Sequence, residues 1–440
     1  MKKIRAGASP AKSILATFIS IIFAGTVLLM LPAATASGEW SDFMTAFFTA
    51  TSATCVTGMS VVDALSHWTR FGHTVILLLI QVGGIGFIIF ATVFASLLNR
   101  RITLRERLAA SQAISVDSMS GIVGLAKKII LRVFLAETAG AMILAIRFIP
   151  SFGVGEGIFL SIFHSISAFC NAGIDILSPG ISAYATDPLV CLTLIALMVT
   201  GGLGFFVWED LRIRKGSLSL HTKLALICTG LLLAGGAVMF AIFEYTNPGT
   251  IGGFSFSEKI LVAFFQSATC RSAGFAMISQ NDMSTLSKAL TMGLMFIGGS
   301  PGSTAGGVKT VTVAVCFLAA ICAMRGKREV FVFGRRLAQT TVYRCISVVF
   351  FGAMLVLCGW VIISIINPLP AQEILFECVA AFSTAGISSG VTPHLNDASK
   401  LILLVLMYLG RVGILTVSLG LMTDKNDSKI NYPEGKIIIG

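Results

Sequence analysis

Charge is scarce in this 440-residue chain: only 12% of its residues are Asp, Glu, Lys or Arg, where soluble domains average about 25%. The ten cysteines form no CxxC pair and no zinc-type Cys/His spacing, and most, such as Cys191 and Cys316, lie in apolar runs. The five histidines are expected near the ends of spans or outside them, away from a nucleophile that they could activate. These shortages exclude an ordinary soluble protein, a disordered chain and a disulfide-rich secreted module, and they argue against an intramembrane enzyme.

Apolar residues are abundant instead: 55% of the chain is hydrophobic and the mean hydropathy is +0.89, which indicates a polytopic membrane protein. Eight long apolar stretches are candidate spans, at 14–31, 74–98, 129–149, 188–208, 224–243, 285–324, 342–366 and 400–422. Four pieces of about ten residues, too short to cross a bilayer, lie between alternate spans, at 43–53, 157–169, 259–269 and 374–382. The first span follows a basic N-terminus, but it is long and more spans come after it, so we expect it to stay uncleaved.

Two glycine landmarks recur four times. The short pieces end at glycines spaced 115, 101 and 112 residues apart, and a second glycine motif follows each after 24 to 28 residues: Gly58 and Gly83, Gly173 and Gly201, Gly274 and Gly298, Gly386 and Gly410. We therefore predict an all-α polytopic membrane protein of four tandem M1–P-loop–M2 repeats around a central pore, with eight spans and four re-entrant half-helices. Repeat 1 would cover 1–98, a cytoplasmic loop and repeat 2 would cover 99–211, repeat 3 would cover 212–324, repeat 4 would cover 325–423, and a cytoplasmic tail would cover 424–440.

Lysine and arginine are unevenly distributed between the two predicted sides. The termini and the segments between repeats (99–128, 209–223 and 325–336) hold 22 of them, and the opposite side holds about five. The positive-inside rule therefore predicts cytoplasmic N- and C-termini for a protein of the cell membrane. Eleven acidic residues fall on the outer side, either as a vestibule that concentrates cations or as solvated loop charges: Glu39, Asp42, Asp63, Glu156, Asp175, Asp187, Glu258, Asp282, Glu373, Glu377 and Asp397.

Each short piece ends in five residues that we predict to form a filter loop: Thr54-Cys55-Val56-Thr57-Gly58, Phe169-Cys170-Asn171-Ala172-Gly173, Cys270-Arg271-Ser272-Ala273-Gly274 and Phe382-Ser383-Thr384-Ala385-Gly386. Irregular backbone at membrane depth is tolerated where it lines a polar cavity, and carbonyl oxygens there can replace the water of a cation. Glycine allows the positive φ that turns carbonyls inward. Arg271 is unusual in a cation filter, and we expect it to point behind the loop and pair with Glu377 or Asp282.

A second irregular stretch, Gly298-Gly299-Ser300-Pro301-Gly302-Ser303-Thr304-Ala305-Gly306-Gly307, interrupts the outgoing span of repeat 3, because glycine and proline at this density break a helix. Gly299 and Arg411 each lie 25 residues past the filter glycine of their repeat, so the repeat symmetry places Arg411 beside this stretch, just below the filter. A cation at the bilayer midplane is a functional candidate, here as an electrostatic barrier or as a donor to the loop's carbonyls. Lys309 either binds the loop or faces the cytoplasm. The stretch lacks GxxxxGK[ST], so no phosphate site is expected.

The chain resembles the superfamily of Trk, Ktr and HKT potassium transporters over essentially its whole length, and within it the membrane subunits of Ktr systems. The resemblance rests on TSATCVTG at 51–58, on the glycine-rich stretch 298–307, on YLGRVG at 408–413 and on PEGK at 433–436. The first repeat starts at once, whereas Trk-type relatives carry two additional N-terminal spans. The resemblance implies that potassium is the transported ion and binds at the filter residues, and that 298–307 and Arg411 form the gate.

The resemblance also implies a homodimer and a cytosolic, KtrA-like nucleotide-binding ring as regulatory partner. The basic cytoplasmic segments either contact anionic membrane lipids or dock such a regulator. We expect no covalently bound cofactor and no nucleic acid partner, and sodium is left open as an activator. The predicted function is a channel-like potassium uptake subunit. A sodium- or proton-coupled symporter is the alternative, although its relay candidates, Glu137, Glu244 and Arg132, are expected in outer helices.

Overall fold

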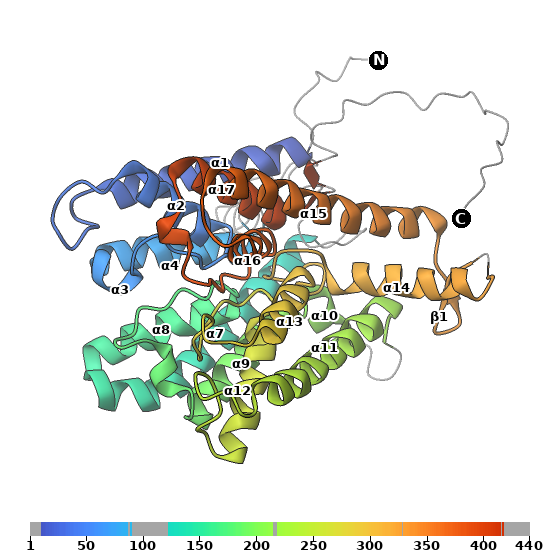
Figure 1. Ribbon diagram of the computed structural model, residues 1–440, viewed down its shortest axis with the longest axis horizontal. Coiled ribbons are helices and arrows are strands. Elements are labelled where there is room, and N and C mark those ends of the chain that lie inside the picture. The colour runs from blue at the N-terminus through green and yellow to red at the C-terminus, as the bar shows by residue number, and fades with distance from the viewer. Residues whose placement is uncertain are drawn as a thin grey trace, which may run out of the picture.

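The computed structural model describes residues 10–86, 89, 122–213, 218–327, 329–414 and 416–417. Most of the expected cytoplasmic loop 99–128 and the whole expected tail 424–440 lie outside these residues. The described chain is mostly helical (Figure 1). The all-α expectation needs one small correction, because the segment between repeats 3 and 4 forms an antiparallel hairpin of β1 (Phe331–Val332) and β2 (Arg335–Arg336), with Phe331 opposite Arg336.

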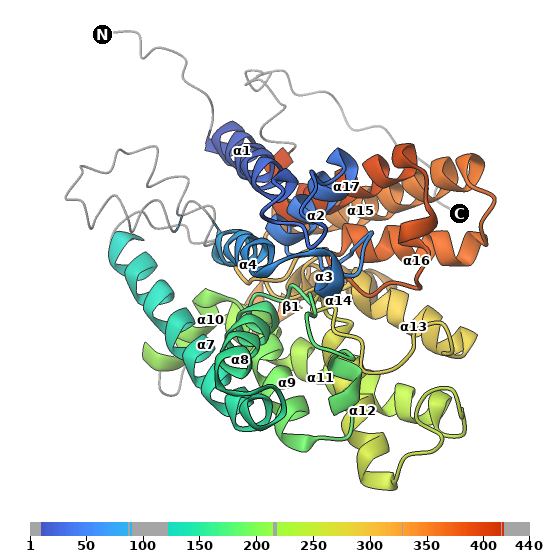
Figure 2. The ribbon, with the colours of Figure 1, turned by 90° about the vertical axis from the view of Figure 1, so that its left-hand side faces the viewer.

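A long helix, a short helix and an outgoing helix follow one another four times. Repeat 1 consists of α1 (Pro10–Met30), α2 (Phe43–Thr54), α3 (Ala64–His67) and α4 (Arg70–Ile85), and repeat 2 of α7 (Ile122–Phe152), α8 (Val154–Phe169), η1 (Ile181–Tyr184), α9 (Pro188–Gly202) and α10 (Phe205–Ile213). Repeat 3 consists of α11 (Leu220–Glu244), α12 (Phe256–Thr269), α13 (Thr285–Phe296) and α14 (Thr310–Met324), and repeat 4 of α15 (Gln339–Ile366), α16 (Ala371–Phe382), η2 (Thr392–His394) and α17 (Asp397–Val412). Figure 2 shows the four repeats arranged around a common centre.

The outgoing helices are interrupted rather than continuous. The expected span 188–208 is wrong in this respect, because α9 and α10 meet at an angle of 89° across Leu203 and Gly204. The helices α4 and α17 likewise end at Gly86 and Gly413, whose φ values of 91° and 87° cannot continue a right-handed helix. Within the described residues, four helices can therefore cross a membrane by length and composition: Lys12–Met30, Val123–Phe152, Leu220–Glu244 and Gln339–Ile366, or five if the bent pair is one span.

Several of the acids that are expected on the outer side have a structural role as helix caps. The Asp42 carboxylate accepts hydrogen bonds from the amides of Met44 (3.0 Å) and Thr45 (3.2 Å), and Asp187 accepts from Leu189 (2.9 Å). A carboxylate at a helix N-terminus satisfies free N–H groups and interacts favourably with the helix dipole. These acids therefore determine where the short and outgoing helices begin. This role is independent of any contribution to an electrostatic field that concentrates cations.

The short helices are the innermost layer of the fold. Phe48 on α2, Phe163 on α8 and Phe265 on α12 are fully buried, whereas the long helices present apolar side chains such as Leu231 to the outside. The helix α17 of repeat 4 packs against α2 of repeat 1, so the last repeat adjoins the first. The fold thus places the ends of all four short helices at its centre.

Candidate functional site

The four predicted filter loops share one backbone conformation. The third residue of each loop has a positive φ although it is not glycine, and the fifth is a glycine with positive φ: Val56 (56°) and Gly58 (89°), Asn171 (60°) and Gly173 (61°), Ser272 (67°) and Gly274 (89°), Thr384 (49°) and Gly386 (71°). Positive φ is uncommon outside glycine, and costly for a β-branched residue such as Val56. Its presence at the same position in all four loops indicates that the fold imposes it.

The amide groups of the loops bond backwards to the short helices. In the first loop, Val56 N donates to Ala53 O (3.1 Å), Thr57 N to Ser52 O (2.7 Å) and Gly58 N to the Ser52 hydroxyl (3.1 Å). The second and fourth loops repeat this pattern in the bonds from Ala172 N to Ser167 O (2.7 Å) and from Ala385 N to Ala380 O (2.9 Å), whereas in the third loop Ala273 N and Gly274 N both donate to Thr269 O (3.0 and 3.3 Å). Because the N–H groups are used behind the loop, its carbonyl groups are left for the opposite side.

Those carbonyl groups have no protein partner. The carbonyls of the last three residues in each loop accept no hydrogen bond from any described residue: 56–58, 171–173, 272–274 and 384–386. The hydroxyls of Thr57 and Thr384 are buried and also have no partner among the described residues. Buried polar groups almost always have a hydrogen-bond partner. These free oxygens are therefore available to bind a ligand or water.

The four filter glycines form a closed ring. A Cβ on Gly58 would overlap the Ala172 carbonyl oxygen, and one on Gly274 would lie 2.7 Å from that of Ala385. A Cβ on Gly173 would likewise overlap the carbonyl oxygen of Ala273, and one on Gly386 that of Thr57, so each glycine faces the residue before the glycine in the next repeat. Glycine is therefore required here by space as well as by φ.

The second glycine motif packs against the first residue of the loops. A Cβ on Gly83, Gly201 or Gly410 would overlap the carbonyl oxygen of Thr54, Phe169 or Phe382. This close approach of backbones explains why the two landmarks keep nearly constant separation. It also turns these three carbonyls toward the outgoing helices, so the first residues of those loops do not lie in the ring of free oxygens.

Arg271 does not form either predicted ion pair. Its side chain is buried behind the third loop, where Nη2 donates to the Thr229 hydroxyl (3.4 Å) and Nε has no described partner. Glu377 instead accepts hydrogen bonds from Ser388 Oγ (2.6 Å), Ser389 N (2.9 Å) and Thr392 Oγ1 (2.7 Å). The expectation of a pair with Glu377 or Asp282 is therefore wrong, because the carboxylate is already saturated by its own loop.

The glycine-rich stretch 298–307 is an irregular loop (the central loop) held by its neighbours. Its ends are joined by a bond from Gly298 N to Val308 O (2.9 Å). Toward repeat 2, Ser300 N donates to Gly202 O (2.9 Å), and the Thr304 hydroxyl contacts the Asn171 amide (2.7 Å). The central loop therefore bonds directly to a filter loop, through a contact that sequence reasoning missed because both residues were known only as members of separate motifs.

Arg411 lies where the repeat symmetry places it. Its guanidinium donates to the carbonyl of Thr304 in the central loop and to the carbonyls of Gly83 and Gly84, the latter at 2.9 Å. The Lys309 ammonium donates to the Ala305 carbonyl in the same loop. Both cations thus bind the backbone of the central loop, and Arg411 also ties it to the outgoing helix of repeat 1.

Glu137 lies on the long outer helix α7, as expected, and its side chain is buried behind the second filter loop. Its carboxyl accepts a hydrogen bond from the Gln81 amide (2.8 Å), and Cys170 Sγ lies 3.8 Å away. The available signal was Gln81 itself, a polar residue inside an apolar run two positions before Gly83. The other relay candidates lie elsewhere: Arg132 pairs with Glu209 (2.6 Å), and Glu244 accepts from Ser284 N (2.9 Å).

Comparisons with known proteins agree with this architecture. Residues 5–430 match the family model TrkH, described as a cation transport protein. The chain is 38% identical to the potassium/sodium uptake protein NtpJ of Enterococcus hirae, covering 100% of this chain and 99% of that protein. It is also 38% identical to the Ktr system potassium uptake protein B of Bacillus subtilis, covering 98% and 97% of the two chains.

Among solved structures, the potassium transporter TrkH of Vibrio parahaemolyticus superposes with a TM-score of 0.77 at 18% identity, covering 96% of this chain and 87% of that one. At this identity the structural similarity shows only that the fold is shared. The assignment to a family rests on the family model and on the relatives at 38% identity. The chain is a multi-pass membrane protein that belongs to the TrkH/Ktr family of cation transporters.

Proposed function

We propose that this chain is the ion-conducting subunit of a Ktr-type potassium uptake system, with the four filter loops as its selectivity filter. The observation that carries the proposal is the ring of backbone carbonyls that no described residue satisfies, at the point where the four filter glycines meet. Oxygen dipoles around an axis replace the hydration shell of a monovalent cation without adding a full negative charge that would trap it. An inward potential then favours uptake by about 2.3 kcal/mol per charge per 100 mV.

Potassium is proposed as the principal ion for two reasons. All four filter positions carry glycine, the residue that goes with potassium preference in the family that the chain resembles, and both relatives at 38% identity are named as potassium uptake proteins. One of them is named for sodium as well. The loops differ from one another outside the glycine, so we expect fewer equivalent sites than in a tetrameric channel and a looser preference for potassium over sodium.

The gate is proposed to be the central loop with Arg411. The loop lies next to the second filter loop through the Asn171–Thr304 contact, and Arg411 holds its Thr304 carbonyl while binding the outgoing helix of repeat 1. Opening would require the central loop to leave the path, which breaks the bond to Thr304. The bonds from Arg411 to Gly83 and Gly84 do not depend on the central loop and would hold the arginine in place.

The orientation and the partners follow from charge and resemblance. With the basic segments cytoplasmic, the capped starts of the short helices face outside and the central loop lies on the cytoplasmic side of the filter. The chain would form a homodimer that binds a KtrA-like cytosolic ring. Nucleotides would bind to that ring and regulate transport through it.

A sodium- or proton-coupled symporter is the second candidate. The buried Glu137 favours it, since this carboxyl contacts Cys170 of a filter loop and not only an outer helix. Its side chain lies behind the loop and away from the ring of carbonyls, and for that reason we rank coupling second.

Cation flux into proteoliposomes that contain only this chain separates the two candidates. A potassium gradient should drive potassium and rubidium flux in the absence of sodium and of a proton gradient. Flux that stops when either of these gradients is removed would overturn the channel proposal in favour of coupled transport. Empty liposomes are the control for leak.

A further inference from the structure

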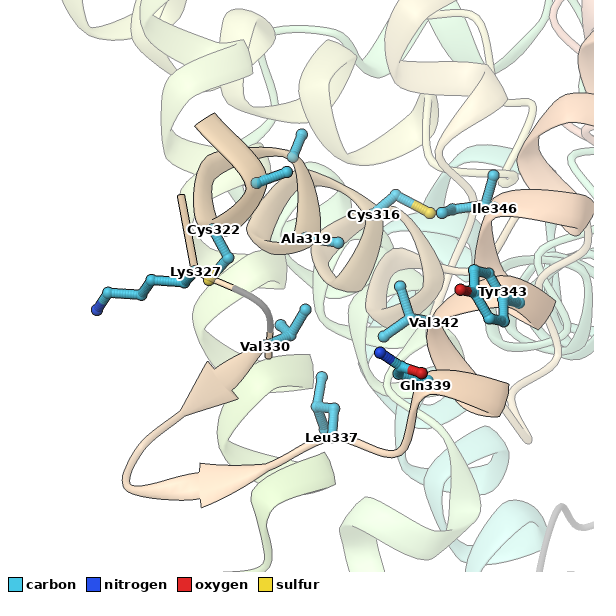
Figure 3. Close-up of a pocket in the computed structure, with 12 residues that line it drawn as sticks. Cys316, Ala319, Cys322, Lys327, Val330, Leu337, Gln339, Val342, Tyr343 and Ile346 are labelled. Atoms are coloured by element: carbon cyan, nitrogen blue, oxygen red, sulfur yellow. The ribbon is translucent and has the colours of Figure 1, made fainter. Parts of the chain in front are cut away.

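A cavity of about 430 Å³ lies between α14 and α15, where the β1–β2 segment connects them (Figure 3). Most of its wall is aliphatic: Ala319, Ala320, Ala323, Val330, Leu337, Val342 and Ile346. Figure 3 shows the Gln339 amide inside this wall and the Lys327 side chain extending away from the cavity at its rim. The cavity is well apart from the ring of carbonyls, and nothing in the proposed conduction path uses it.

The helices around this cavity face away from the protein core. Only Thr310 and Val315 of α14 are buried, and Phe317 on α14 and Phe350 on α15 are 67% and 58% exposed. A single apolar residue on a surface is ordinary, but apolar faces on two adjacent membrane helices are faces for lipid. The cavity therefore opens where acyl chains would surround the protein.

The segment that joins the two helices beside this cavity is strongly basic, and its Lys327 lines the cavity. The residues between the two helices and the first turns of α15 include five described cations against a single acid: Arg325, Lys327, Arg335, Arg336 and Arg344, with Glu329. Arg336 pairs with Glu329 at 2.7 Å, and the other four cations make no ion pair with a described residue. An apolar cavity beside unpaired cations is complementary to a molecule with an acyl chain and a negative head group.

We propose that this cavity is a binding site for an anionic phospholipid, with an acyl chain among the alanines of α14 and the phosphate group at the basic segment. Basic pockets between membrane helices on the cytoplasmic side are suited to such head groups. In the proposed orientation this segment lies at the cytoplasmic surface, where positive residues collect.

The site has a direct structural connection to the central loop. The helix α14 begins two residues after Val308, and its Thr310 N donates to Gly299 O in the central loop at 3.0 Å. A lipid against α14 would therefore stabilise one position of the helix that continues from this loop. This consequence rests on the proposed gate, whereas the binding site itself does not.

Lipid retention by the purified full chain tests the binding site without any flux measurement. Native mass spectrometry would compare added dioleoyl phosphatidylglycerol with dioleoyl phosphatidylcholine. The chain should retain the anionic lipid preferentially. Ala320→Trp, which fills the cavity, should lower its retention about tenfold, and the double variant Arg325→Gln/Lys327→Gln should lower it by a similar factor.

A second cavity provides the matched control. It has about 420 Å³ between α7 and α8, is lined by residues such as Ala141 and Ala145, and has no lysine or arginine in its wall. Ala141→Trp should leave phosphatidylglycerol retention unchanged. Equal retention of both lipids, an unchanged Ala320→Trp variant, or an equal loss in Ala141→Trp would overturn the proposal. Because Arg325 and Lys327 are exposed, their double variant remains informative if Ala320→Trp fails to fold.

Discussion

The guanidinium of Arg411 in repeat 4 donates to the carbonyl of Thr304 in repeat 3, and this bond joins two residues 107 positions apart at the centre of the molecule. The same side chain reaches Gly83 and Gly84 of repeat 1. Arg411 therefore connects repeats 1, 3 and 4. The contact between Thr304 and Asn171 extends this connection to repeat 2. Substitutions of Arg411 therefore test the proposed gate most directly.

Replacing Arg411 by alanine should increase potassium flux at least about tenfold, because each charge-assisted hydrogen bond that holds the central loop contributes about 1.5–3 kcal/mol. The measurement is rubidium uptake into proteoliposomes at equal protein density.

Arg411→Lys distinguishes the two roles left open for this residue. Lysine keeps the charge but cannot match the planar fork that spans several carbonyls. High flux in this variant would identify Arg411 as a latch, whereas low flux in lysine and high flux in alanine would identify an electrostatic barrier. Unchanged flux in both variants would remove Arg411 from the gate.

Gly58→Ala should reduce potassium flux by more than about tenfold or abolish its preference over sodium. The added methyl group would overlap the Ala172 carbonyl and would sit on a residue with a φ of 89°. Gly230→Ala is the matched control, since a Cβ there meets no atom within 4 Å. Equal flux and selectivity in wild type and Gly58→Ala would contradict the assignment of the ring.

Much of the architecture could be predicted from sequence because it repeats. The spacing of the two glycine landmarks placed four loops at one level and put Arg411 beside the central loop, and the structure has both. The breaks at Gly86, Gly204 and Gly413 could not be predicted from hydropathy, since an apolar run has the same hydropathy whether or not a single glycine bends it. The partner of Arg271 lies on another helix of the same repeat and that of Glu137 lies in the preceding repeat, so both depend on helix packing, which residue type alone does not reveal.

Gly410→Ala should destabilise the protein by about 1–3 kcal/mol, because its Cβ would overlap the Phe382 carbonyl in a closely packed interior. The thermal unfolding midpoint in detergent is the readout. Gly293→Ala on α13 is the control, since a Cβ there has open space and alanine is the better helix former. A Gly410→Ala variant as stable as Gly293→Ala would show that the close approach between α17 and the fourth filter loop is not required.

Glu137→Gln should leave potassium flux and its dependence on pH unchanged, since glutamine can still accept the hydrogen bond from Gln81 that holds the carboxyl behind the second filter loop. Flux recorded between pH 6 and pH 8 in wild type and variant is the measurement. If the wild type varies with pH and the variant does not, Glu137 carries the proton of a coupled transporter and the second candidate function gains the advantage.

The most direct measurement is a crystal structure of the protein grown in rubidium, with the ion located by its anomalous scattering. Rubidium replaces potassium chemically and reports its own position. We predict an anomalous peak on the axis between Gly58, Gly173, Gly274 and Gly386, within coordination distance of the free carbonyls of the filter loops. Well-ordered loops with no peak between them, or rubidium bound only elsewhere in the protein, would contradict it.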